Sequence, residues 1–179
     1  MEIAFLHALQ DAIGCPPLDA FMAAVTVLGD HGVIWVAIGL FLLFFKKYRR
    51  WGLTMLLAVL VAWLFGEQLL KGVVARPRPF VEDPSFALVI PPPSGYSFPS
   101  GHTICAFAGA TVLLFSPMRR RWKAVVAVLA VLIGFSRIYL CVHNPTDVLA
   151  GALIGIVFAL VAVWLSNKIA ARGKSRTAS

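Results

Sequence analysis

Three short segments of the chain carry side chains suited to breaking a phosphate ester. Two histidines would allow one imidazole to attack phosphorus while the other protonates the departing oxygen. Three cations would hold the phosphoryl oxygens, because phosphoryl transfer depends mostly on positioning and electrostatic stabilisation. The segments are Lys71 with Arg78-Pro79, then Pro99-Ser100-Gly101-His102, then Ser136-Arg137 with His143 and Asp147.

His143 and Asp147 lie four residues apart across a predicted helix start. At this spacing the carboxylate can fold back to the imidazole, fix its tautomer and stabilise the imidazolium. The simpler alternative is that Asp147 only caps its own helix while His143 faces lipid headgroups. His102, on a different segment, is predicted to be a second, independent acid.

Both histidines lie beside predicted helix N-termini. Ser100 is a favourable N-cap before the apolar run that follows it, and Gly101 lets a ligand approach the backbone closely. Asn144-Pro145 repeats the arrangement, with Asn144 as cap and Pro145 at the first helical position. Free N–H groups at a helix N-terminus bind anions, although ordinary capping would also explain each motif alone.

The remaining ionisable residues receive simpler interpretations. Glu67 precedes Lys71 by one helical turn and is expected to pair with it or to line the pocket. Arg76 is interpreted as an interfacial side chain outside the site. His7 and His31 are expected at the surface. No cluster of hard oxygen ligands suggests a magnesium site, so we expect neither a metal nor a cofactor.

The composition is that of a membrane protein. Hydrophobic residues make up 60% of the 179 residues and charged residues only 13%, which is too apolar for a soluble domain. Ionisable groups at membrane depth are functional by default, since they are costly to bury. We expect one all-α membrane domain over residues 1–179, with about six transmembrane helices. The apolar stretches are 31–45, 51–74, 102–116, 122–142 and 147–167, with a broken, uncertain crossing in 3–28.

The cations predict the orientation of this bundle. Of 16 Lys and Arg residues, most fall in the segments 46–50 and 119–123 and in the C-terminal tail, which the positive-inside rule places in the cytoplasm. The net charge of +8 therefore needs no nucleic acid partner. The 75–101 loop and the 137–147 turn then share the opposite face. The proline-rich 75–99 loop could form a lid or lipid entrance there, or only connect two helices.

The three segments resemble the signature of the type 2 phosphatidic acid phosphatases, a family related to the vanadium haloperoxidases. That signature is a lysine, six residues and Arg-Pro; then Pro-Ser-Gly-His; then Ser-Arg, five residues, His, three residues and Asp. Every position is matched within residues 71–147. The resemblance implies a helical bundle whose pocket acts on lipid phosphates at the outer membrane face without a metal.

The resemblance also implies residue roles. His143 would be the nucleophile and form a phosphohistidine, with Asp147 orienting it and His102 as the general acid. The phosphate would be held by Lys71, Arg78, Ser100, Gly101 and Arg137.

A short chain with small outer loops looks like a bacterial inner-membrane member. Undecaprenyl diphosphate is the favoured substrate, and phosphatidylglycerophosphate or phosphatidate is the alternative. A phosphotransferase would use the same residues. A lipid transporter or flippase, with the polar cluster only as a binding site, is the competing hypothesis from a different class.

Overall fold

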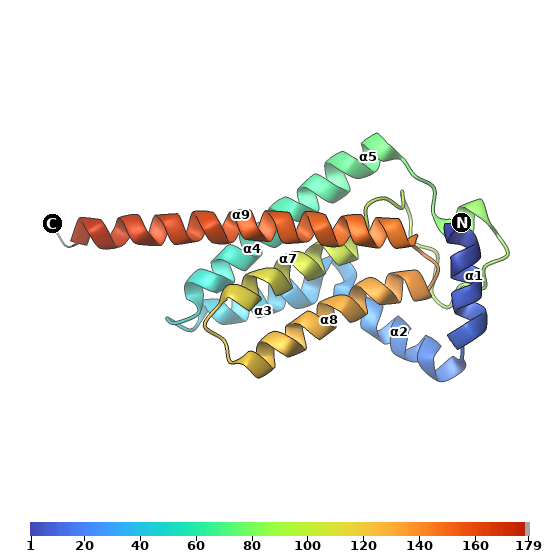
Figure 1. Ribbon diagram of the computed structural model, residues 1–179, viewed down its shortest axis with the longest axis horizontal. Helices are drawn as coiled ribbons and strands as arrows, with labels where there is room; N and C mark the ends of the chain where they lie inside the picture. The colour runs from blue at the N-terminus through green and yellow to red at the C-terminus, as the bar shows by residue number, and fades with distance from the viewer. Residues whose placement is uncertain (178–179) are drawn as a thin grey trace.

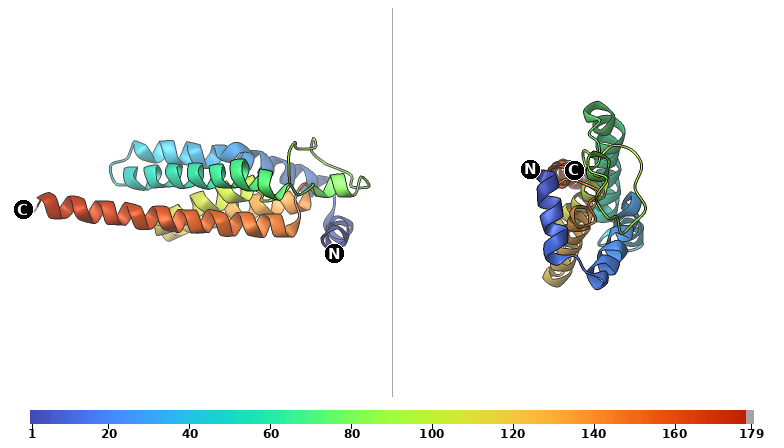
Figure 2. Two further views of the ribbon diagram at one scale, coloured as in Figure 1. Left: turned by 90° about the horizontal axis from the view of Figure 1, so that it is seen from above. Right: turned by 90° about the vertical axis from the view of Figure 1, so that its right-hand side faces the viewer.

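The protein is a bundle of helices whose long members run roughly side by side (Figures 1 and 2). The computed structural model describes residues 1–177, and every regular element in this part of the chain is helical. The N-terminal elements are α1 (Glu2–Ile13), α2 (Pro16–Gly29), a 3₁₀ turn η1 (Asp30–Gly32) and α3 (Val33–Leu43). The middle elements are α4 (Arg49–Trp63), the π-helical η2 (Leu64–Leu70), α5 (Lys71–Val74) and α6 (Pro79–Glu82). The last three are α7 (Gly101–Phe115), α8 (Arg120–Tyr139) and α9 (Pro145–Thr177).

The predicted all-α membrane bundle is confirmed, although it has fewer crossings than the six expected. Within the described residues, four helical stretches are long and apolar enough to span a membrane, and α7 is a shorter apolar helix. The four stretches are Pro16–Leu43, Arg49–Glu82, Arg120–Tyr139 and Pro145–Arg172.

The difference lies at the N-terminus, where residues 3–28 were expected to form a broken crossing. The chain does break between Ile13 and Pro16, but α1 lies across the end of the bundle (Figures 1 and 2). The second half, α2, instead continues through η1 into α3 as one 28-residue stretch. Gly32, with a φ of 69°, lets the backbone turn within η1 without ending this stretch.

α7 is the central helix, which explains why it can be shorter than a span. It packs against α4, α8 and α9, and buried side chains occur all around it. A helix that is buried on every side meets protein instead of lipid, so its length need not match the bilayer. Close packing depends on small residues: a Cβ at Gly155 would lie 2.5 Å from the Ile104 carbonyl oxygen.

The two ends of the bundle differ in their chemistry. The basic connections between α3 and α4 and between α7 and α8 lie at the same end as the C-terminal part of α9 (Figures 1 and 2). The loop from α6 to α7, the turn from α8 to α9, and α1 gather at the opposite end. The fold thus brings the three motif segments to one end.

Candidate active site

One pocket of about 490 Å³ collects most of the residues singled out from the sequence. Of the eight predicted site residues, six line it: Lys71, Arg78, Gly101, His102, Arg137 and His143. Ser100 and Asp147 lie behind its wall, and both are completely buried. A groove of about 500 Å³ between α4 and α9 has mostly apolar walls and no histidine, so the site chemistry belongs to the first pocket.

His143 presents one ring nitrogen to the pocket and the other to buried polar groups. Arg78 Nη1 donates a hydrogen bond of 3.2 Å to His143 Nε2. On the opposite side of the ring, Nδ1 lies 3.4 Å from Ser97 Oγ and 3.7 Å from Asp147 Oδ2. Because the guanidinium can only donate, Nε2 carries the lone pair and Nδ1 the hydrogen. This is the tautomer in which Nε2 can act as a nucleophile.

The turn between α8 and α9 holds His143 in a dry environment. The side chain is 2% exposed, and the backbone N–H donates to the Arg137 carbonyl at 3.2 Å. Burial is the main influence on this imidazole and lowers the pKa of His143, since desolvation disfavours the charged ring. The resting imidazole is therefore neutral, as a nitrogen nucleophile must be.

The carboxylate of Asp147 is fixed by several donors instead of by the histidine alone. Its Oδ2 accepts hydrogen bonds from Ser97 Oγ at 2.5 Å and from the Asn144 N–H at 2.8 Å, while its Oδ1 accepts one from Arg76 at 2.9 Å. Asp147 thus caps its own helix and also faces His143, whereas the alternative in which His143 faces lipid headgroups is wrong because the ring is buried. The 3.7 Å separation from the ring is an ion-pair distance and too long for a hydrogen bond.

His102 is not independent, contrary to the sequence-based expectation. Its Nε2 lies 2.7 Å from Asp30 Oδ1 in η1. The sequence did not predict Asp30 as the partner of His102, because Asp30 lies 72 residues earlier in the chain. Only the bend after α2 brings its carboxylate to the N-terminus of α7. The pocket therefore contains a second pair of histidine and aspartate.

The three cations reach the pocket from different elements. Lys71 pairs with Glu67 at 2.7 Å, as the helical spacing predicted. Arg78 is held by the carbonyl oxygens of Ser94 and Gly95, both at 3.0 Å. Arg137 donates to Thr26 Oγ1, but its buried Nε has no hydrogen-bond partner among the described residues. Arg137 therefore keeps one N–H group that the described residues leave unused.

Ser100 and Gly101 make contacts that the sequence did not predict. Ser100 occupies the N-cap position of α7, yet its side chain makes no capping bond and instead accepts a hydrogen bond from Thr103 Oγ1 at 3.0 Å. A Cβ at Gly101 would lie 1.9 Å from Glu67 Oε1. Glycine at 101 thus leaves room for the Glu67 carboxylate in its observed position, quite apart from any ligand.

The proline-rich loop forms part of the pocket wall. Ile90, Pro91, Pro93 and Ser94 line the pocket, and the loop is tied to the site by the Ser97 N–H, which donates to the Arg76 carbonyl at 2.8 Å. The loop therefore does more than connect α6 to α7.

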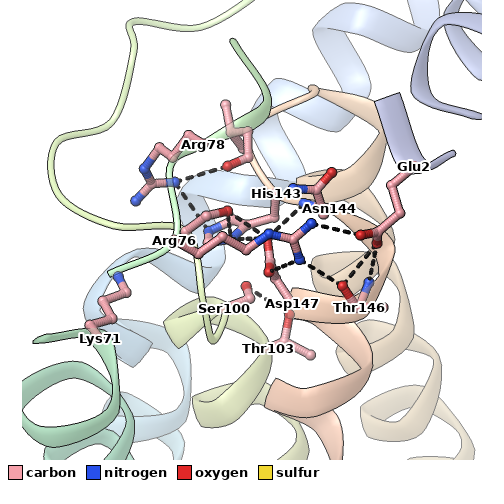
Figure 3. Close-up of polar contacts among 12 residues, drawn as sticks. Glu2, Lys71, Arg76, Arg78, Ser100, Thr103, His143, Asn144, Thr146 and Asp147 are labelled. Atoms are coloured by element: carbon pink, nitrogen blue, oxygen red, sulfur yellow. Dashed lines mark hydrogen bonds and ion pairs between the residues drawn. The ribbon is translucent and has the colours of Figure 1, made fainter. Parts of the chain in front are cut away.

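Two polar residues behind the pocket were also missed. Arg76, interpreted from the sequence as interfacial, bonds to Asp147, Thr146 and Glu2 (Figure 3). Ser97 links the proline-rich loop to Asp147. The one feature of the sequence that could have indicated a role for Arg76 near the site is its position two residues before Arg78. This spacing puts both arginines on the same short extended segment.

No metal cage is evident in the described part of the chain, where no group of three or more His, Cys, Asp and Glu side chains could hold an ion. The positive charge of the pocket comes instead from the lysine and two arginines that line it. A cationic pocket with two imidazoles, set in a membrane-embedded bundle, defines a class of enzyme that transfers phosphoryl groups.

Comparison with known proteins identifies the family. The model of the PAP2 superfamily matches residues 51–170, and the chain belongs to this superfamily. It is 37% identical over 153 residues to an undecaprenyl-diphosphatase of Sulfolobus acidocaldarius, with 84% of this chain and 71% of that protein covered. The chain is accordingly a membrane phosphatase, as the motif resemblance implied.

Two solved structures share the fold. The PAP2-type phosphatidylglycerolphosphate phosphatase of Bacillus subtilis superposes with a TM-score of 0.76 at 31% identity, covering 94% of this chain and 85% of that one. LpxE of Aquifex aeolicus superposes with a TM-score of 0.72, also at 31% identity, covering 90% of this chain and 94% of that one.

Proposed function

We propose that the protein, as a single domain over residues 1–179, hydrolyses a lipid phosphate or diphosphate through a phosphohistidine intermediate and without a metal. One observation carries this proposal. His143 and His102 line the same pocket as Lys71, Arg78 and Arg137. Nucleophile, acid and charge stabilisation can therefore act on one phosphoryl group.

The proposed reaction has two steps. In the first, His143 Nε2 attacks the terminal phosphorus and the bond from this phosphorus to the leaving oxygen breaks, and His102 gives its proton to that oxygen. The leaving group is the lipid alcohol for a monophosphate and the lipid phosphate for a diphosphate. In the second, His102 takes a proton from a water that attacks the phosphohistidine. The bond from phosphorus to Nε2 then breaks, and inorganic phosphate leaves. Asp147 faces Nδ1–H throughout and stabilises the positive ring formed by the attack.

Lys71, Arg78 and Arg137 stabilise the phosphoryl oxygens during both steps. In the free protein Lys71 is paired with Glu67, so the substrate phosphate competes with this carboxylate for the ammonium. Ser100 and Gly101 contribute through the start of α7, where Gly101 lines the pocket and backbone N–H groups can face the anion.

The pocket opens at the extracytoplasmic face in this proposal, with the C-terminus in the cytoplasm. Support comes from the charge distribution, because the basic 46–50 and 119–123 segments lie at the end of the bundle opposite the α6–α7 loop and the α8–α9 turn (Figure 1). Both of these connections contribute residues to the pocket. In a bacterial cell this arrangement corresponds to a multi-pass protein of the inner membrane, and the substrate is a lipid of its outer leaflet.

Undecaprenyl diphosphate is the favoured substrate, because the Sulfolobus relative carries the name undecaprenyl-diphosphatase. Phosphatidylglycerophosphate is the second candidate, supported by the Bacillus subtilis structure. The test is a phosphate-release panel with purified protein in detergent, comparing these two lipids with phosphatidate and diacylglycerol diphosphate. The highest kcat/KM on the isoprenoid diphosphate would support the assignment, and release from none of the four would refute the proposal.

Metal independence has its own measurement in the same assay. We expect phosphate release to continue in EDTA, because three cationic side chains already supply the charge around the anion. A loss of activity that magnesium restores would contradict this part of the proposal.

A further inference from the structure

The buried carboxylate of Asp147 has a cationic partner that lies outside the pocket. A carboxylate with no solvent exposure must be paired, because burying an uncompensated charge is strongly unfavourable. Arg78 is engaged by His143 and by loop carbonyls. Arg76 is the residue that meets the need, since its Nη1 donates to Asp147 Oδ1 at 2.9 Å.

Arg76 is itself held by the first helix of the chain. Its Nη2 donates to Glu2 Oε2 at 2.6 Å. The other oxygen of Glu2 accepts hydrogen bonds from the N–H and the Oγ1 of Thr146, both at 2.9 Å. Arg76 Nη1 also donates to Thr146 Oγ1 at 2.7 Å. Three segments therefore meet in one closed network: α1, the α5–α6 connection and the start of α9 (Figure 3).

We propose that Arg76 is a positioning residue for Asp147 and that Glu2 holds Arg76 in place, so that α1 acts as a strap behind the site. This inference rests on the proposed phosphatase function. Binding of Oδ1 by Arg76 fixes the rotation of the carboxylate and leaves Oδ2 toward His143 Nδ1. Arg76 does not line the pocket, so it acts on the ring through Asp147 and does not touch the phosphate.

This placement predicts a specific kinetic signature. A residue that aligns the nucleophile without contacting the substrate affects kcat, whereas a phosphate ligand affects KM as well. Arg76→Gln should lower kcat about 100-fold, the size of effect that a misplacement of about 1 Å produces, with little change in KM. Glu2→Gln should lower kcat less, about tenfold, because Arg76 keeps its direct bond to Asp147.

The variants are Arg76→Gln, Arg76→Lys, Glu2→Gln and the double variant with both glutamines, each carrying its affinity tag at the C-terminus. His7→Ala is the matched control. It removes a different α1 contact, the pair of His7 with Asp83 at 2.9 Å and the stacking on Phe86, and it leaves Arg76 untouched. We expect normal kcat for His7→Ala and partial recovery for Arg76→Lys relative to Arg76→Gln.

The double variant shows whether Glu2 acts through Arg76 or whether the two residues affect kcat independently. If Glu2 acts only through Arg76, the double variant has the same kcat as Arg76→Gln alone. Multiplied losses, an unchanged kcat in Arg76→Gln, or a rise in KM at constant kcat would each overturn the proposal.

A second measurement, which does not depend on catalytic activity, distinguishes failure of this proposal from failure of the proposed function. The thermal unfolding midpoint in detergent is measured for the same set of variants. If the shifts in unfolding midpoint for Glu2→Gln and Arg76→Gln do not add up in the double variant, the network is supported. Additive shifts overturn it. An inactive wild-type protein with non-additive shifts would refute the lipid phosphatase proposal while leaving the strap in place.

Discussion

The two pairs of histidine and aspartate in the pocket differ in almost every physical respect. His143 and Asp147 are buried, come from one turn and its following helix, and stand 3.7 Å apart. His102 and Asp30 come from distant segments, lie 2.7 Å apart, and are 19% and 49% exposed. The buried carboxylate is paired with an arginine and bonded to a serine and a backbone N–H, whereas the other is half exposed and is paired with His102.

The different environments of the two imidazoles indicate which one is suited to attack phosphorus and which one to transfer a proton. A neutral ring in a dry, fixed position favours attack on phosphorus, because its lone pair is not hydrated and its direction is set. A partly exposed ring beside a mobile lipid oxygen favours proton exchange, since it must pick up a proton again in each turnover. The environments of the two rings thus support the assignment of His143 as nucleophile and His102 as acid.

The largest effect is expected for His143→Ala. Removal of the proposed nucleophile should lower kcat by about 10⁴-fold or more, because the covalent intermediate forms on its Nε2. The measurement is phosphate release from the best lipid of the panel. His7→Ala, which also breaks a histidine–aspartate pair, serves as the control and should remain active. Substantial turnover by His143→Ala would show that the buried pair is not the one that attacks.

His102→Ala should have a smaller effect that depends on the leaving group. We expect a loss of about 10²- to 10⁴-fold on a lipid monophosphate, the usual contribution of a general acid. A lipid diphosphate releases a less basic oxygen and needs less help, so its loss should be smaller. Parallel kcat measurements on phosphatidate and diacylglycerol diphosphate make the comparison. Equal losses on both lipids would argue that His102 has a different role.

The two aspartates can be compared directly by replacing each with asparagine. Asp147→Asn should lower kcat about 10³-fold, because a neutral amide can neither balance the imidazolium nor form the ion pair with Arg76. Asp30→Asn should lower kcat only about tenfold, since water reaches that pair and screens it. Phosphate release and unfolding midpoints would be measured for both variants. The reverse order of effects would exchange the roles given to the two pairs.

The smallest effect concerns the pH profile. Burial lowers the pKa of His143, and the attacking ring must be neutral. Activity is therefore kept as the pH falls through the ordinary histidine value of about 6.5 and is lost only at a lower pH. The acidic limb of kcat/KM in the free enzyme measures this. A limb at or above the ordinary value would show that the ring is wetter than the structure indicates.

Much of this site could be predicted from the sequence because its signature residues lie in three compact motifs. Those motifs contain six residues that the fold brings to one pocket. The partners behind them were missed because their proximity arises from tertiary structure: Glu2 bonds to Thr146 across 144 positions. The number of crossings was overestimated because apolar composition alone cannot show that η1 joins α2 to α3, or that α1 lies across the bundle.

The network of Glu2, Arg76 and Thr146 has a consequence for biogenesis. Glu2 in α1 contacts Thr146 at the start of α9, so α9 must be synthesised and inserted before the network behind the nucleophile can close. A chain whose α9 has not yet inserted would then have the motif residues without their final geometry. The site becomes competent only once α1 and α9, which are distant in sequence, have come together.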